Sequence, residues 1–345
     1  MTIAIYLIAI LGLAVLMVVH EGGHYVAARA FGMRVTRFSI GFGPTIWRHK
    51  PKDGETVYQV ALIPFLAYVQ IAGMNPYEEI DPKDKASYAN ASVLARIVTI
   101  AAGPLTNYFF ASVLIFFGLL IGGRELADET SMRVVVEPGP AQAAGVRTGD
   151  RVLTVNGEAI GDWVQLKKSV SSHPGEPVDV AVMRGSDTLH LTVTPKPVGD
   201  KDAGLIRVTP PRQVVPVGLV DAAKISVIAP PMFVYENAVA IGRVISGKEK
   251  LQVNGPVGIV KETAKQAKIG AGVLLQFLGM LSAYLGAFNL LPFPALDGGR
   301  LIFLAAEAVS RRKADAKIEA RVHAVGLLML LTLIAFVTYA DVIAK

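Results

Sequence analysis

Long apolar stretches separated by polar segments determine how this chain is organised. Four of them run over residues 3–31, 97–123, 269–296 and 324–340. Each approaches or exceeds the ~20 residues that a helix needs to cross the hydrocarbon core of a bilayer. The pattern predicts a multi-pass α-helical membrane protein with about four transmembrane helices.

The segment from residue 55 to 73 interrupts this helical pattern. It is rich in β-branched and aromatic residues and carries Pro64 in its middle, which disfavours a helix and predicts a β-hairpin. The segment is too apolar for a free loop, so we expect the hairpin to associate with the membrane, covered by the spans. An ordinary peripheral hairpin is the alternative.

Turn signals recur between the second and third stretches, for example at Asn156-Gly157 and His173-Pro-Gly, with short alternating runs between them. Closely spaced turns and short strands predict a β-rich soluble domain over residues 124–200.

The next segment, residues 201–268, is expected to be a linker with an amphipathic helix. Its residues 226–246 are apolar but contain two prolines and charges, which favours a helix lying at the outer membrane surface. The membrane core then consists of two parts, residues 1–123 and 269–345.

Composition supports a membrane protein. Of the 345 residues, 52% are hydrophobic and 18% are charged, against about 25% charged residues in soluble domains. The net charge of +6 comes without a nucleic-acid motif, so we expect anionic lipid, not nucleic acid, as the partner of this charge. The chain has no cysteine, so any metal site must use histidine and carboxylate ligands.

Basic residues predict the orientation of the spans. Lys and Arg concentrate in loops on the cytoplasmic side, and the loop between the third and fourth stretches is rich in them. The loop should therefore be cytoplasmic, which places both termini and the soluble domain outside. The first span has no basic segment before it and is expected to be retained, not cleaved as a signal peptide. The basic residues of the loop are Arg300, Arg311, Arg312, Lys313, Lys317 and Arg321.

A possible metal site lies inside the first apolar stretch, at His20-Glu21-Gly22-Gly23-His24. Ionisable groups in a membrane span are costly and usually functional. The two histidines are one helical turn apart and can share a metal ion, and Glu21 beside them can take a proton from an activated water. A chance pentapeptide, or polar residues packed against a neighbouring helix, is the alternative.

A third ligand is expected, because catalytic zinc is normally held by three protein side chains. The prolines at 292 and 294 break the third stretch and allow a loop to carry Asp297 inward. The alternative is that the prolines end the span and Asp297 caps the next helix.

These motifs together resemble the site-2 protease family of intramembrane zinc proteases, in its bacterial regulator-of-sigma-E branch. His20-Glu21-x-x-His24 and Asn289-x-x-Pro-x-Pro-x-Leu-Asp297-Gly match its two signatures, and Gly103-x-x-x-Asn107 matches its second-span element. The resemblance covers nearly the whole chain. The segment after Pro64 departs from the family, since relatives often have Leu-Gly-Gly there.

The resemblance implies a Zn2+ cofactor bound by His20, His24 and Asp297, with Glu21 as the catalytic residue. It further implies substrate contacts, for which Asn289, Asn107 and Tyr68 are the candidates. Capping or packing of the broken helix is the alternative for Asn289.

The soluble domain would be a single PDZ domain, recognised by Pro140-Ala-Gln-Ala-Ala-Gly and Val155-Asn-Gly. The family cleaves membrane segments of single-pass proteins that another protease has already shortened, such as anti-sigma factors and signal-peptide remnants. The expected location is the bacterial cell inner membrane, with the active site near the cytoplasmic side.

Two other functions remain open from the sequence. A non-catalytic membrane receptor or scaffold presenting a PDZ domain would not need Glu21. A transporter would share broken helices and intramembrane polar groups, but it would carry repeated spans, which this sequence lacks.

Overall fold

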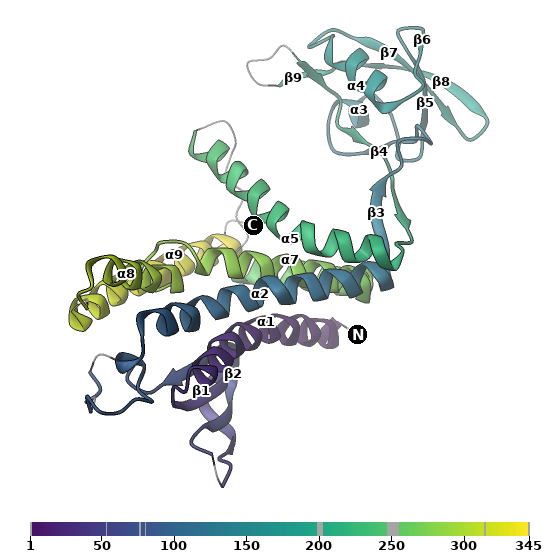
Figure 1. Cartoon of the computed structure of the whole chain (residues 1–345). Helices are drawn as coiled ribbons and strands as arrows, with labels where there is room; N and C mark the ends of the chain where they lie inside the picture. Colours follow the sequence, from purple (N-terminus) through teal and green to yellow (C-terminus); the bar gives the residue numbers. More distant parts are fainter. Residues whose placement is uncertain are drawn as a thin grey trace. The chain divides into compact units, whose positions relative to one another are not determined.

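The computed structural model describes residues 2–52, 54–75, 77–79, 81–198, 203–246, 255–313 and 315–343 (Figure 1). The chain divides into two compact units. One, the membrane unit, comprises residues 1–122 and 217–345, and the other, the β-rich unit, comprises residues 123–216.

Four helices of the membrane unit are long and apolar enough to cross a bilayer, counting only the described residues. They are α1 (Thr2–Ala30), α2 (Val93–Gly122), α7 (Ala271–Asn289) and α9 (Ala316–Ile343). This confirms the prediction of a multi-pass α-helical membrane protein. The third helix ends at Asn289, seven residues before the predicted end of its span, because the proline-containing segment after it leaves the helix.

Helices α2 and α7 approach closely along a seam of glycines. A methyl group on Gly118 would lie 2.8 Å from the carbonyl oxygen of Gly272, and one on Gly279 would lie 2.9 Å from that of Ala111. Small residues allow such backbone-to-backbone packing between membrane helices. The glycines of the seam are Gly118, Gly122, Gly272, Gly279 and Gly286.

The described part of the membrane unit has three further α-helices: α5 (Leu219–Ile245), α6 (Pro256–Ile269) and α8 (Asp297–Ser310). Helix α5 begins seven residues before the amphipathic helix that the sequence predicts, and its Ala222 is buried against Ile115 and Leu119 of α2. Helix α6 packs against α1 and α7.

Two long strands, β1 (Val35–His49) and β2 (Val57–Ile71), pair antiparallel beside α1. Phe38 of β1 lies opposite both Tyr58 and Val69 of β2. The structure therefore corrects the predicted hairpin within residues 55–73: both halves of this segment pair with β1, and not with one another, in the described register. Composition indicated β structure but could not identify the partner strand.

The β-rich unit is built on a four-stranded sheet in the order β6-β5-β7-β8. Its core includes Val134, Leu166, Val178, Val182 and Val193. The sheet strands are β5 (Arg151–Val155), β6 (Glu158–Ala159), β7 (Val178–Arg184) and β8 (Asp187–Val193), and the helices are α3 (Pro140–Ala143) and α4 (Trp163–Ser171).

Residues 203–215 belong to this unit and do not form the linker that the sequence predicts from residue 201. They contribute strands that pair with earlier segments, so that Arg212 lies opposite Ala127 and Val208 opposite Val136. Their two- to four-residue strands are too short for a periodic signal. The paired strands are β3 (Arg124–Ala127) with β12 (Arg212–Val215), β4 (Val135–Val136) with β11 (Val208–Thr209), and β9 (Lys196–Val198) with β10 (Ala203–Leu205).

Candidate active site

The two histidines of α1 lie on one face of the helix, in the membrane unit. His20 and His24 are only 5% and 6% exposed, and their Nε2 atoms are 3.3 Å apart. This follows from the helix, because residues four apart lie above one another on the same side. The two Nε2 atoms therefore face the same point in space.

Asp297 reaches the same place from the first residue of α8. Its Oδ2 atom lies 3.1 Å from Nε2 of His20 and 3.4 Å from Nε2 of His24. The carboxylate approaches the histidines and does not cap α8: the N-cap residue is Leu296, and no side-chain cap hydrogen bond forms there in the described structure. Behind it, the backbone is tightly folded: a Cβ on Gly298 would collide with the carbonyl oxygen atoms of Leu290 and Leu291.

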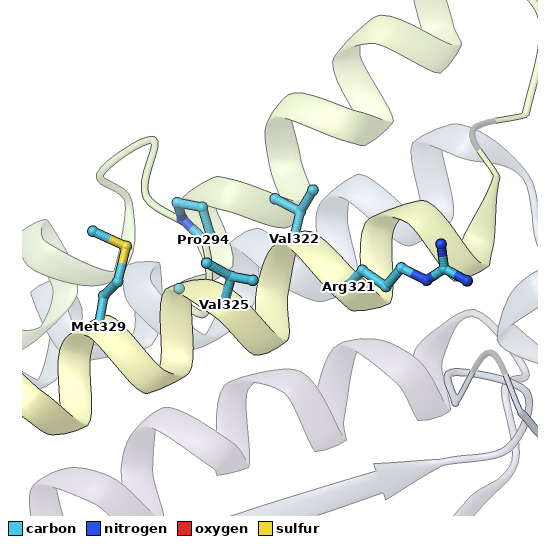
Figure 2. A pocket seen from close by; sticks show the side chains of 6 residues that line it. Pro294, Arg321, Val322, Val325 and Met329 are labelled. Carbon is cyan, nitrogen blue, oxygen red and sulfur yellow. The ribbon is translucent and has the colours of Figure 1, made fainter.

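Helix α9 holds the segment that precedes Asp297. Nδ1 of His323 accepts a hydrogen bond from the backbone N–H of Ala295 at 2.9 Å. A Cβ on Gly326 would collide with Pro294, and Figure 2 shows Pro294 beside Val322 and Val325 of α9, at a cavity of about 300 Å³. His323 has no ligand spacing to the other histidines, so the sequence does not indicate its role.

Glu21 points toward strand β2. Its carboxylate accepts a hydrogen bond from the backbone N–H of Val69 at 2.9 Å, and it lies with His20 and His24 in a group whose ligand atoms are within 4.8 Å of one another. Two carboxylates therefore compete for a metal held by the histidines. We favour Asp297, because its Oδ2 approaches both Nε2 atoms, whereas Glu21 is bonded to the strand.

The donor set fits zinc. Two imidazole nitrogens and one carboxylate oxygen converge, which is a ligand combination found in catalytic zinc sites with an open fourth position. Each histidine also has a partner for its other ring nitrogen, as zinc-bound histidines almost always do. For His24, Nδ1 lies 2.8 Å from the carbonyl oxygen of Thr99, and for His20, Nδ1 lies 3.1 Å from Nδ2 of Asn107.

Helix α2 supplies both of these partners from one face. Thr99, Gly103 and Asn107 are spaced four residues apart, and Gly103 has His24 so close that a Cβ would collide with its ring. Asn107 was expected to contact substrate, but it is fully buried and faces His20. The sequence motif indicates Asn107 but not its partner His20, which lies 87 positions away in the chain.

Tyr68 and Asn289, the other expected substrate contacts, are placed elsewhere. The hydroxyl of Tyr68 accepts hydrogen bonds from Gln59 and Arg37 within the β1–β2 pair. The Asn289 side chain donates to the carbonyl oxygen of Leu285 in its own helix. In the described part of the chain, neither side chain hydrogen-bonds to the converging groups.

Comparison with known proteins places this arrangement in a family. Peptidase family M50 matches residues 8–333. The chain is 30% identical over 402 residues to zinc metalloprotease RasP of Geobacillus kaustophilus, and 29% identical over 405 residues to regulator of sigma-W protease RasP of Bacillus subtilis; each alignment covers 94% of both chains. The chain therefore belongs to peptidase family M50, the site-2 protease family that its motifs resemble.

Proposed function

We propose that this protein is an intramembrane zinc metalloprotease that cleaves peptide bonds within the membrane segments of single-pass proteins. The observation that carries the proposal is the convergence of His20, His24 and Asp297, with distances of 3.1 to 3.4 Å between their ligand atoms. Family membership supports it, because the motifs that define the resemblance are the ones that meet here.

His20, His24 and Asp297 would hold the ion. Zinc bound there supplies Lewis acidity, which polarises a carbonyl and lowers the pKa of a water to about 7. The histidines are buried, and electrostatic interactions among buried groups are stronger than they are in bulk water.

Glu21 is the proposed general base. It takes the proton from the attacking water and returns it to the leaving amine. The Val69 N–H holds its carboxylate at 2.9 Å, so that the base is oriented by the strand, while the helix fixes its distance from the histidines. A carboxylate beside the ligands has no role in a purely structural metal site, and this argues against the non-catalytic scaffold.

Substrate would bind as an added strand. A helical substrate hides its peptide bonds in its own hydrogen bonds, so cleavage needs local unwinding, and an extended segment gains affinity by pairing with a sheet edge. The β1–β2 pair is the candidate, because Val69 of β2 contacts the proposed base. Proline substitutions in residues 57–63 should lower turnover of a membrane substrate; unchanged turnover would refute this mode of binding.

The β-rich unit is proposed to be a PDZ domain that screens substrates outside the membrane. Its strongest support is a cavity of about 560 Å³, which is lined by apolar side chains of α4 and by residues 204–208 and Pro210. Peptide-binding grooves of this kind pair a helix with a strand edge. The proposed orientation places this unit and both termini outside the cell, with the active site near the cytoplasmic side of the inner membrane.

The substrates would be membrane proteins already shortened by another protease. One relative is named a regulator of sigma-W protease, and by analogy we propose anti-sigma factors or remnants of signal peptides. Lipid would be the only other partner, and nucleic acid is not expected.

The experiment compares cleavage of a model single-span substrate by the wild-type protein and by Glu21→Gln in detergent, with zinc content measured on both. Glu21→Gln should lose about 10²- to 10⁴-fold in rate, as expected for a general base, and retain zinc. Zinc bound equally by His20→Ala and the wild type would refute the ligand set, and full activity of Glu21→Gln would refute the role of the base.

A further inference from the structure

The two histidines differ in how their second ring nitrogen is held. Nδ1 of His24 lies 2.8 Å from the Thr99 carbonyl oxygen, which only accepts hydrogen bonds. The proton of His24 is therefore fixed on Nδ1, and the Nε2 lone pair is free for a metal ion. A backbone carbonyl imposes this tautomer permanently.

His20 has a partner that can act in two ways. Its Nε2 lies 3.1 Å from the Asp297 carboxylate, and its Nδ1 lies 3.1 Å from Nδ2 of the Asn107 amide. The other end of the amide, Oδ1 of Asn107, is buried and has no hydrogen-bond partner among the residues that the structure describes. The amide oxygen of Asn107 is thus available as a hydrogen-bond acceptor next to His20.

Binding of a cation by Nε2 determines which hydrogen-bond partner the other ring nitrogen of His20 requires. The lone pair of Nε2 then points to the cation, so the proton of the neutral ring must be on Nδ1. This proton needs an acceptor, and the Asn107 amide beside Nδ1 provides one in its oxygen Oδ1. Either end of the amide can face the ring, since the two ends have nearly the same shape.

We infer that Asn107 is a positioning residue for His20, whose amide oxygen Oδ1 accepts the Nδ1 proton in the zinc-bound site. The inference rests on the proposed zinc ligands. It assigns Asn107 a role at the metal and not at the substrate. Asparagine suits the position because one side chain provides both a donor and an acceptor.

Measurement of zinc affinity on the full-length protein tests this role independently of cleavage. Asn107→Leu keeps the approximate size but has no acceptor, and should bind zinc about 10- to 100-fold more weakly, as is typical when the outer partner of a metal-binding histidine is removed. Asn107→Asp keeps an acceptor oxygen and should bind zinc within about threefold of the wild type. Cobalt substitution gives a visible spectrum, which should change in the leucine variant only.

Ser282→Ala is the matched control. The Ser282 hydroxyl is fully buried and donates to the backbone carbonyl of Asn107 at 2.9 Å, so its loss disturbs the same contact between α2 and α7 without changing the amide. Zinc affinity of this variant should equal that of the wild type. An equal loss of zinc affinity in Ser282→Ala and Asn107→Leu would mean that Asn107 contributes only packing.

The outcomes separate this inference from the proposed function. Wild-type zinc affinity in Asn107→Leu, or a weak affinity in Asn107→Asp, would overturn the positioning role. If Asn107→Leu does not fold, the comparison of Asn107→Asp with the wild type decides alone. Zinc binding that is unaffected by His20→Ala would instead refute the ligand set on which the inference rests.

Discussion

Replacing Gly103 by alanine should disturb the proposed metal site without touching a ligand. The added Cβ would lie 2.5 Å from Cε1 and 2.9 Å from Cδ2 of His24, and closer still to its Nε2. Carbon atoms in contact are about 3.5 to 4.0 Å apart, so the ring has to recede by about 1 Å. Metal–ligand distances tolerate deviations of only about 0.2 Å.

A displacement of this size corresponds to a loss of about 10²-fold in rate, or about 2.7 kcal/mol at 1.36 kcal/mol for each factor of ten. Cleavage of a single-span substrate in detergent, with zinc content determined on the same sample, measures both consequences. We expect turnover and zinc occupancy to fall together.

Gly22→Ala is the control. Gly22 lies between the two histidines on α1, yet no atom of another described segment would lie within 4 Å of a Cβ added there. This variant should retain wild-type activity and gain helix stability of up to about 1 kcal/mol. Activity of Gly103→Ala within about threefold of the wild type would refute the argument, because it would mean that α2 moves away at little cost.

Three further predictions concern other parts of the molecule. Glu307→Leu removes the carboxylate that binds the buried Arg96 guanidinium through two hydrogen bonds. Unfolding experiments should show a loss of about 3–5 kcal/mol that Arg96→Met substantially reverses, and an additive double variant would contradict this. Hydrogen bonding from Arg184 lowers the pKa of Asp150. This pair therefore stabilises the β-rich unit above about pH 4, and its contribution is lost as the pH falls through the lowered pKa. Limited proteolysis between pH 7 and 3 should show this loss in the wild type and a flatter profile in Arg184→Met, and identical profiles would disprove it. Val69→Pro removes the N–H that orients the proposed base and should lower turnover about tenfold or more while zinc stays bound, whereas Val69→Ala, which keeps the N–H, should not.

The sequence predicted the elements whose signals are local. The four apolar stretches approach or exceed the length that a membrane helix requires, and the i, i+4 spacing of His20 and His24 is sufficient to place them on one helical face. Asp297 could be anticipated because two histidines leave a zinc ligand missing and a proline-broken span supplies a carboxylate. Each of these arguments needs only residues close together in the chain or a known ligand count.

Features that depend on distant partners could not be predicted. The segment from residue 57 to 71 is recognisably β-forming, but its pairing with residues 35–49 depends on long-range contacts that composition does not encode. Strands such as Val208–Thr209 are too short to have a period. Asn107 was identified as part of a motif, yet its contact with His20 could be seen only after folding had brought α1 and α2 together.

The glycine seam between α2 and α7 has a consequence for how a substrate gains access. Lipid supplies no hydrophobic force that presses membrane helices together, so the contact is held by close packing of the backbones, and separating these two helices would forfeit many such contacts at once. Helix α9, by comparison, is largely exposed along its length, and it touches the segment preceding Asp297 mainly through His323 and Gly326. An opening that admits a membrane segment therefore costs least at α9. The α2–α7 pair acts as the fixed frame against which such an opening occurs.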